Sequence, residues 1–359
     1  MLAAPFGVYL HIPFCAHRCD YCAFATWTDR AHLTDRYLAA CGLEIERAVE
    51  AGMPEATTVF VGGGTPSLVA GPLLVRVLDA IPRSPGAEVT IECNPDTVTP
   101  GLLDAYAAGG VNRLSFGVQS MVPSTLAALG RTHDPANVRR CVALARAAGI
   151  PTFNLDLIYG GAGETLPDWR RTLEEALALE PPHVSAYALT VEAGTPLALD
   201  PPRHPDDDLQ ADEYLLATEL LPAAGLEWYE ISNWARPGHE CRHNLLYWQQ
   251  EDYLGFGCAA HSHRAGRRFW NVRTPERYLE LIEAGRPAEG GSETLDAAQR
   301  AEEALVLQVR TRAGVPASTL PLEQLSELVD VRDDRVVLTV QGRLLANEVS
   351  LRLRPPPAG

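Results

Sequence analysis

The chain has 359 residues, of which 46% are hydrophobic, so it can bury a large core and carry one large domain with a smaller one. Its formal net charge of −16 argues against nucleic acid as a main partner, because phosphate binding needs a basic field. No apolar run approaches the roughly 20 residues of a membrane-spanning helix, and Met1 begins no signal-peptide pattern. We expect a cytoplasmic protein without a transmembrane segment, which leaves peripheral membrane contact open.

The first two-thirds of the sequence alternates short β-rich runs with amphipathic stretches. The predicted strands cover residues 8–12, 57–61, 89–92, 113–118, 152–158 and 184–189. The predicted helices cover residues 33–51, 72–81, 100–107, 136–148 and 166–179. This order is typical of parallel strands with helical crossovers, so the sequence predicts an α/β fold.

Three cysteines follow the first predicted strand with the spacing C-x3-C-x2-C. On one short loop, Cys15, Cys19 and Cys22 can hold three corners of a [4Fe–4S] cluster and leave one iron open to a small molecule. Zinc is an alternative because His11 and His17 lie close by, although a second ligand pair at finger-like spacing is missing. Disulfides are disfavoured, since the other five cysteines are spread singly along a long chain.

The polar residues that stand out fall at the ends of successive predicted strands. The cysteine loop follows the first strand, a run of three glycines follows the second, and Glu92, Gln119 and Asp156 end later ones. One such residue would be an ordinary turn former. Five in succession favour a site at the carboxyl face of a barrel, where barrel enzymes build their active sites.

A series of short motifs in a fixed order resembles one known family. The motifs are HIPFC with CDYC (11–22), VGGGTPS (61–67), ECNP (92–95), RLSFGVQS (113–120), LGR (129–131), NLDLIYG (154–160) and HNLLYW (243–248). The chain resembles the radical S-adenosylmethionine (SAM) superfamily and, within it, the oxygen-independent coproporphyrinogen III oxidase family with its HemW-type haem-chaperone branch. The resemblance covers roughly residues 6–265 and implies a partial (β/α)6 barrel.

The resemblance also implies a SAM site beside the cluster. Glycine at the end of the second strand lets the backbone approach the methionine moiety closely. A carboxylate can hold the ribose hydroxyls or the amino group, and Arg131 can pair with the carboxylate of SAM. The alternative for Arg131, considered without the resemblance, is a surface cation at a helix end. The residues expected to bind the cofactor are Tyr9, Tyr21, Gly63, Gly64, Thr65, Glu92, Gln119, Arg131 and Asp156.

Two departures separate this chain from the oxidase branch. That branch carries a further cysteine two residues after the third cluster cysteine, where this chain has Phe24. It also has a long segment before its first strand, whereas here only seven residues precede that strand. Both departures match the haem-chaperone branch and disfavour decarboxylation of coproporphyrinogen III.

The HNLLYW element is the candidate haem site. His243 and Tyr247 stand four residues apart, so on a helix they share a face, and both residue types ligate haem iron. Trp248 can then cover the macrocycle. The alternative is aromatic packing of this segment against the barrel, with His243 as a hydrogen-bonded core residue.

Three segments are expected: a radical SAM partial barrel with the [4Fe–4S] cluster (1–235), a loop-rich segment over the barrel (236–295) and a small, helical, winged-helix-like domain (296–359). The last should hold helices at 296–311 and 319–329, a β-rich stretch at 336–340 and an apolar run at 344–353.

As a whole, the sequence favours a radical SAM-fold haem chaperone that binds a [4Fe–4S] cluster, SAM and haem as cargo. Its expected partners are recipient haemoproteins and an electron donor. The alternatives are an oxygen-independent coproporphyrinogen III oxidase of porphyrin biosynthesis, and a barrel whose cluster is purely structural.

Overall fold

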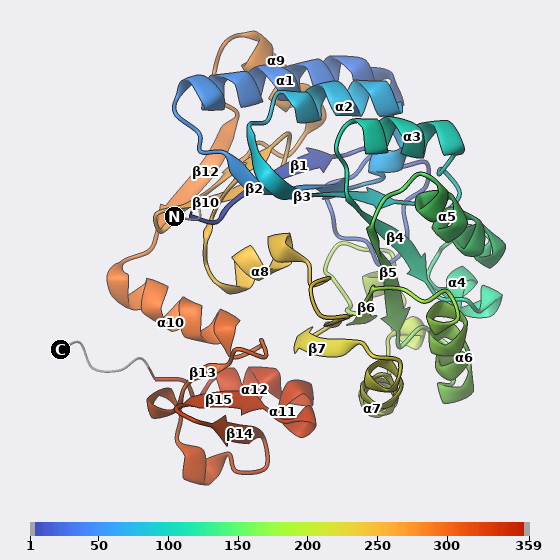
Figure 1. The fold of residues 1–359 in the computed structure, drawn as a ribbon, viewed down its shortest axis with the longest axis vertical. Coiled ribbons are helices and arrows are strands. Elements are labelled where there is room, and N and C mark those ends of the chain that lie inside the picture. Colours follow the sequence, from blue (N-terminus) through green and yellow to red (C-terminus); the bar gives the residue numbers. More distant parts are fainter. Residues whose placement is uncertain (1–3, 355–359) are drawn as a thin grey trace.

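The computed structural model describes residues 4–354, and a single twelve-stranded sheet dominates this part of the chain (Figure 1). The strand order is β12-β11-β10-β9-β1-β2-β3-β4-β5-β6-β8-β7. The six strands predicted from the sequence are β1 to β6, each parallel to the next. They are β1 Phe6–Ile12, β2 Ala56–Gly63, β3 Arg83–Cys93, β4 Arg113–Gln119, β5 Thr152–Tyr159 and β6 His183–Ala188.

Helices join these strands and cover the outer face of the curved sheet (Figure 1). They are α1 Thr34–Glu50, α2 Gly71–Asp79, α3 Pro100–Ala108, α4 Pro123–Ala128, α5 Pro135–Ala147, α6 Leu166–Leu177 and α7 Asp207–Ala223. Local sequence fixes several starts, because Thr99, Asp134 and Thr165 accept hydrogen bonds from backbone N–H groups in the first turns of α3, α5 and α6. The α/β partial barrel predicted from the sequence is thereby confirmed.

The segment 236–295, expected to be loop-rich, instead contains two helices and four strands and extends the sheet. After β7 Glu227–Glu230 and β8 Asn233–Ala235 come α8 Arg242–Trp248, β9 Asp252–Phe256, β10 His261–Arg264, β11 Arg267–Asn271, α9 Pro275–Glu283 and β12 Glu289–Thr294. β9 pairs in parallel with β1 and so satisfies the backbone groups on that edge. The new strands are only four to six residues long, too short for a clear alternation in a Gly- and His-rich sequence.

The C-terminal part forms a small unit with its own apolar cluster. It holds α10 Ala297–Gln308, a three-stranded sheet, and two short helices, with bounds β13 Val315–Pro316, β14 Val329–Arg332, β15 Arg335–Leu338, α11 Val340–Leu344 and α12 Ala346–Ser350. The helix predicted at 319–329 is wrong: only short 3-10 turns occur there, since Pro321 lacks an N–H and disfavours helical backbone at Leu320. The small winged-helix-like domain is otherwise as expected.

Within residues 4–354, no helix has the length and apolar character needed to cross a bilayer. The outermost ends of the first and last predicted segments, residues 1–3 and 355–359, lie outside the described part of the chain. The segment boundaries at 235 and 295 stay predictions.

Candidate cofactor site

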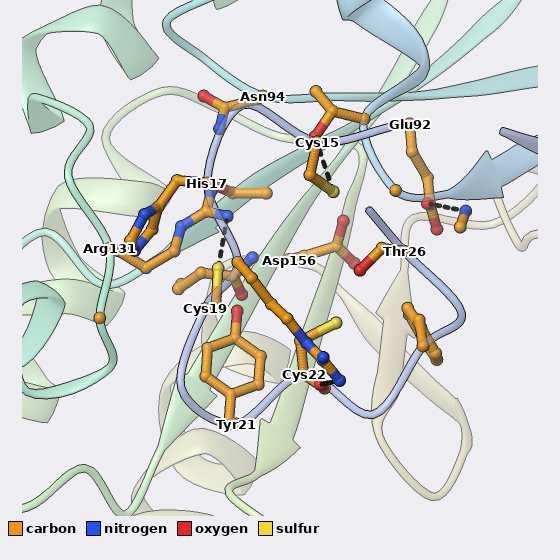
Figure 2. Close-up of a pocket in the computed structure, with 18 of the residues that line it drawn as sticks. Cys15, His17, Cys19, Tyr21, Cys22, Thr26, Glu92, Asn94, Arg131 and Asp156 are labelled. Carbon is orange, nitrogen blue, oxygen red and sulfur yellow. Dashed lines mark hydrogen bonds between the residues drawn. The ribbon is translucent and has the colours of Figure 1, made fainter. Parts of the chain in front are cut away.

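A cavity of about 640 Å³ opens at the carboxyl ends of the parallel strands (Figure 2). It brings together most of the predicted site residues, namely Cys15, Cys19, Tyr21, Cys22, Gly63, Gly64, Thr65, Glu92, Gln119, Arg131 and Asp156. Tyr9, His243 and Tyr247 do not line it. The residues that the sequence placed at strand ends therefore do line one cavity. The predicted haem ligands, His243 and Tyr247, are outside its lining.

Backbone hydrogen bonds close the loop that carries the three cysteines. The N–H of Cys15 donates to the carbonyl of Trp27 at 3.0 Å, and the N–H of Trp27 donates to the carbonyl of Pro13 at 2.8 Å. Within the loop, the N–H of Cys22 donates to the carbonyl of Cys19 at 3.2 Å. The loop thus leaves and rejoins the barrel at one place, and its cysteines border the cavity (Figure 2).

The glycine run after β2 is joined to the base of the cysteine loop. The N–H groups of Gly64 and Thr65 donate to the carbonyls of Ile12 and Phe14 at 2.7 and 2.8 Å. A Cβ on Gly64 would lie 2.7–2.8 Å from these same carbonyl oxygens and 3.1 Å from the Sγ of Cys15. Only glycine permits this close approach of the two backbone segments. The glycine run is therefore explained by packing against the cysteine loop as well as by the need for a cavity lining without side chains.

A second contact fixes the far end of the cysteine loop. The Nε2 of His11 lies 2.9 Å from the carbonyl oxygen of Ala25, which can only accept, so Nε2 carries the proton. The Nδ1 of His11 then accepts from the hydroxyl of Tyr9 at 3.0 Å. A Cβ on Gly63 would lie 2.4 Å from the imidazole of His11. Tyr9 therefore supports the cysteine loop through His11.

The surroundings of the thiols suit a cluster. The hydroxyl of Thr65 donates to the Sγ of Cys15 at 3.6 Å, and Nη1 of Arg131 donates to the Sγ of Cys19 at 3.5 Å. Donors and positive charge at sulfur stabilise thiolates, the form in which cysteine binds metal. Burial, however, raises the pKa of the Cys15 and Cys22 thiols. Binding to iron would offset that cost, because metal binding deprotonates a thiol.

The three thiols are not gathered around one point. Among residues 4–354, no three His, Cys, Asp or Glu side chains are arranged to hold a single metal ion. In a cubic cluster each thiolate binds a different iron, so its ligands stand farther apart than those of one ion. The residues present fit the larger group.

Arg131 connects the barrel to the cysteine loop. Besides its contact with Cys19, its Nη2 donates to the carbonyl of Gly117 at 2.8 Å, and its Nε donates to His133 Nδ1 at 3.3 Å. The guanidinium is thereby held against β4 and a predicted cluster ligand. Its pairing with the carboxylate of SAM stays a prediction.

Two buried carboxyl groups, those of Glu92 and Asp156, belong to the cavity lining. Glu92 accepts from the N–H of Gly63 at 3.1 Å; burial, reinforced by the negative charge of Asp156, raises the pKa of Glu92 to about 8. Burial also raises the pKa of Asp156, which accepts from the hydroxyl of Ser115 at 2.7 Å and the amide of Asn154 at 2.8 Å. Near pH 7 Glu92 is therefore largely protonated and can both donate and accept hydrogen bonds.

Gln119 is strained where β4 ends. Its φ of +61° lies in the left-handed region that non-glycine residues rarely adopt, and the pairing with β5 shifts register between Gly117 and Gln119. Such irregularities re-aim a side chain at functional sites. Here the affected side chain lines the cavity.

His243 is a buried structural residue in this conformation. Its Nδ1 lies 2.8 Å from Thr58 Oγ1, its Nε2 lies 2.8 Å from the hydroxyl of Tyr247, and its ring stacks on Phe60. Burial lowers the pKa of His243 to about 3. Both ring nitrogens are engaged, so the surroundings of His243 do not support the haem-ligand role expected from the sequence.

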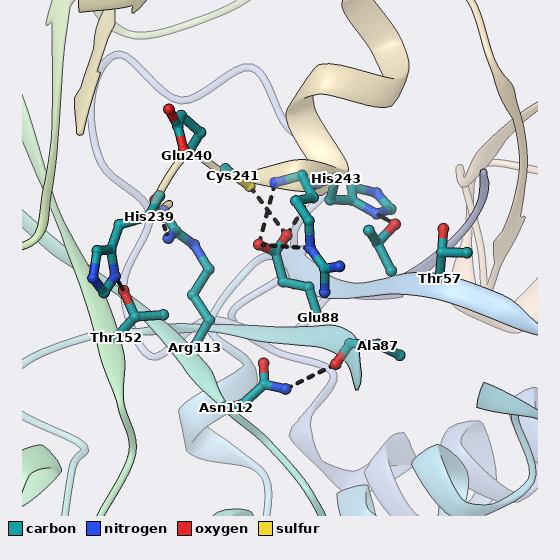
Figure 3. A network of polar contacts seen from close by, with 12 residues as sticks. Thr57, Ala87, Glu88, Asn112, Arg113, Thr152, His239, Glu240, Cys241 and His243 are labelled. Carbon is teal, nitrogen blue, oxygen red and sulfur yellow. Dashed lines mark hydrogen bonds and ion pairs between the residues drawn. The ribbon is translucent and has the colours of Figure 1, made fainter. Parts of the chain in front are cut away.

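Glu88 anchors the helix that carries the HNLLYW element (Figure 3). Its carboxylate accepts from the backbone N–H groups of Arg242 and His243 at 3.2 and 3.0 Å and from the thiol of Cys241 at 3.7 Å. A carboxylate at a helix N-terminus satisfies free N–H groups and complements the helix dipole. Sequence reasoning missed Glu88, because its partners lie about 150 positions further along the chain.

A smaller cavity of about 200 Å³ adjoins the larger one, with which it shares Phe24, Gly63, Glu92, Ser115, Asp156 and Tyr187. The three predicted site residues absent from the large cavity, Tyr9, His243 and Tyr247, line it. Arg113, also buried there, donates from Nη1 to the carbonyl of His239 at 3.0 Å (Figure 3). Nothing in the sequence pattern distinguished Arg113 from an exposed strand residue.

The fold and the cysteine loop define the class of protein. Residues 9–176 match the family model of the Radical SAM superfamily. The structure described as coproporphyrinogen III oxidase (HemN) from Escherichia coli, a radical SAM enzyme, has the same fold. Its TM-score is 0.83 at 22% identity, over 97% of this chain and 89% of that chain.

Comparison with related sequences identifies the family within the radical SAM superfamily. Heme chaperone HemW from Mycobacterium tuberculosis is 42% identical, over 97% of this chain and 95% of its own length. Heme chaperone HemW from Bacillus subtilis is 36% identical, over 96% and 97% respectively. The chain therefore belongs to the HemW family of the radical SAM superfamily.

Proposed function

We propose that the protein is a haem chaperone that holds a [4Fe–4S] cluster and SAM, binds haem as cargo and transfers it to recipient haemoproteins. The observation that carries this proposal is the similarity, over nearly the whole chain, to proteins named heme chaperone. The site adds chemical support, because one cavity presents three cysteines, a glycine run and the buried carboxyl groups of Glu92 and Asp156.

Cys15, Cys19 and Cys22 would hold three irons and leave the fourth for the amino and carboxylate groups of SAM. The cluster would supply the electron that reductive cleavage of SAM requires. The glycine run gives the methionine moiety a backbone surface without side chains. Further contacts to SAM are proposed for Tyr21, Gly63, Gly64, Thr65, Glu92, Gln119, Arg131 and Asp156, while Tyr9 would act through His11.

At near-neutral pH, the protonated carboxyl group of Glu92 can donate a hydrogen bond to a carboxylate or hydroxyl oxygen of SAM. The neighbouring Asp156, already bonded to Ser115 and Asn154, can accept one. The two groups therefore offer a donor and an acceptor in one cavity, which suits recognition of hydroxyl or amino groups.

The oxidase alternative rests on the likeness of fold to coproporphyrinogen III oxidase. Against it stands Phe24, where the oxidase branch carries its further cysteine. We therefore expect no decarboxylation of coproporphyrinogen III.

The test is haem titration of anaerobically purified protein, followed by transfer to an apo-haemoprotein. We expect saturable binding and transfer. 5′-Deoxyadenosine release should be measured with and without coproporphyrinogen III. SAM-dependent conversion of that substrate at roughly one turnover per second or more would establish the oxidase instead.

The proposal includes a cytoplasmic location and an electron donor for the cluster. It includes no nucleic-acid partner, because the net charge of −16 would repel a phosphate backbone.

A further inference from the structure

Three large apolar or aromatic side chains that line the large cavity are exposed to solvent, and they mark its opening. Phe24 is 61% exposed, Leu68 41% and Tyr187 38%, and all three line this cavity, while Phe24 and Tyr187 also line the smaller one. They come from three separate elements: the cysteine loop, the turn Pro66–Leu68 after β2, and the end of β6. Single exposed apolar residues are ordinary, but several around one opening indicate a surface that is covered by a ligand.

We propose that haem docks across this mouth surface, formed by Phe24, Leu68 and Tyr187, and not at the HNLLYW element. The inference rests on the proposed function and assigns its cargo a site. A haem is a broad, flat, apolar disc with two carboxylates on one edge. Aromatic and aliphatic side chains spread around an opening match its face.

Charge around the opening favours the same ligand. Arg18 is exposed and lines the cavity, although the chain as a whole is strongly acidic. Nη2 of Arg18 donates to the carbonyl of Cys22 at 3.2 Å, which holds the guanidinium beside the loop. The carboxylates Asp96 and Glu192 also line the cavity. A haem on the mouth would therefore be oriented with its propionates towards Arg18 and away from these acids.

The size of the cavity sets the depth at which haem binds. A cavity of about 640 Å³ suits one ligand of small-molecule size. SAM and a complete haem do not both fit inside it, so a haem bound together with SAM must lie across the opening. In that position it would shield the cysteine loop from solvent.

The other imidazoles that line either cavity are not accessible to iron. His183, like His243, is bonded at both ring nitrogens, at 2.6 Å to Asn154 and 2.7 Å to Tyr229. A haem iron could reach His183 or His243 only after these buried bonds were broken. On the mouth surface, by contrast, no buried bond has to break.

The test is haem titration of the cluster-loaded double variant Phe24→Ser/Leu68→Ser. We expect its Kd for haem to rise by about tenfold or more, because two of the three apolar contacts of the surface are removed. Iron content and the spectral response of the cluster to SAM should stay at wild-type values. The matched control is Leu351→Ser, since Leu351 is 71% exposed but lies in the C-terminal unit.

If Phe24→Ser lowers the iron content, Leu68→Ser/Tyr187→Ser carries the test, because neither residue belongs to the cysteine loop. Wild-type haem affinity in a fully loaded double variant would overturn the mouth site while leaving the chaperone proposal intact. If wild-type protein itself binds no haem, the proposed function fails instead.

Discussion

The Nδ1 of His243 lies 2.8 Å from the hydroxyl oxygen of Thr58, and this contact joins α8 to β2. The other ring nitrogen, Nε2, is hydrogen-bonded to the hydroxyl of Tyr247, so both nitrogens have a partner. A Cβ on Gly7 of β1 would lie 3.3 Å from the same imidazole. The HNLLYW element therefore packs against β1 and β2, and its histidine acts first as a packing and hydrogen-bonding residue.

Replacing His243 with Ala should destabilise the protein. It removes a fully buried ring and leaves the hydroxyls of Thr58 and Tyr247 without a partner, for an expected loss of about 2–4 kcal/mol. Urea unfolding followed by circular dichroism measures this loss. His261→Ala, at an exposed position of β10, should change stability by less than about 0.5 kcal/mol. Unchanged stability in His243→Ala, with haem affinity lost, would restore the ligand role.

Replacing Glu92 with Gln should make the cofactor-free protein less sensitive to alkaline pH. The pKa of Glu92 is raised by burial to about 8 in the folded state, from an ordinary value of 4.5. As pH rises above 4.5, this carboxyl group ionises in the unfolded chain but stays protonated in the folded protein. The stability that it contributes at low pH is therefore lost as pH rises towards 8. Gln carries no charge and removes the loss.

The measurement is the difference in unfolding free energy between Glu92→Gln and wild type, followed between about pH 5 and pH 9. The difference should grow in favour of the variant as pH rises. Asp104→Asn, in α3, provides a control outside the site. A flat difference would show that Glu92 ionises normally.

Cys15, Cys19 and Cys22 should be necessary for iron. Anaerobically purified protein is expected to carry about four irons per chain, and replacing any one of the three with Ala should empty the site. Cys141→Ala is the control, because this thiol is buried against the carbonyl of Pro95, outside the site. Full iron content in Cys19→Ala, measured by colorimetric iron assay, would contradict the assignment.

Replacing Arg131 with Ala should weaken SAM binding by about 1–3 kcal/mol, the range for a lost hydrogen bond to a charged group. The spectrum of the reduced cluster, titrated with SAM, reports the affinity. Because Arg131 also contacts Cys19, iron content must be measured on the same samples. Arg139→Ala, an exposed ion-pair position, is the control. If the loaded variant responds to SAM like wild type, Arg131 serves only to hold the cysteine loop.

Local sequence determined much of this protein. The alternation of strands and helices, the cysteine loop after β1 and the glycine run after β2 are short-range patterns, because strand pairing, capping and turn preference depend on nearby residues. The carboxyl ends of parallel strands must meet at one edge. The sequence therefore located the cavity that joins Cys15, Glu92 and Asp156.

Only the tertiary structure decided which segments far apart in the sequence contact one another. The pairing of β9 with β1, the anchoring of α8 by Glu88 and the contact of Arg131 with Cys19 join residues about 110 to 250 positions apart. The spacing of His243 and Tyr247 predicted that they share one face of a helix. It could not predict whether that face meets solvent or the core. Packing buried His243 and left Phe24 exposed at the cavity mouth, because burial depends on which elements meet in the folded chain.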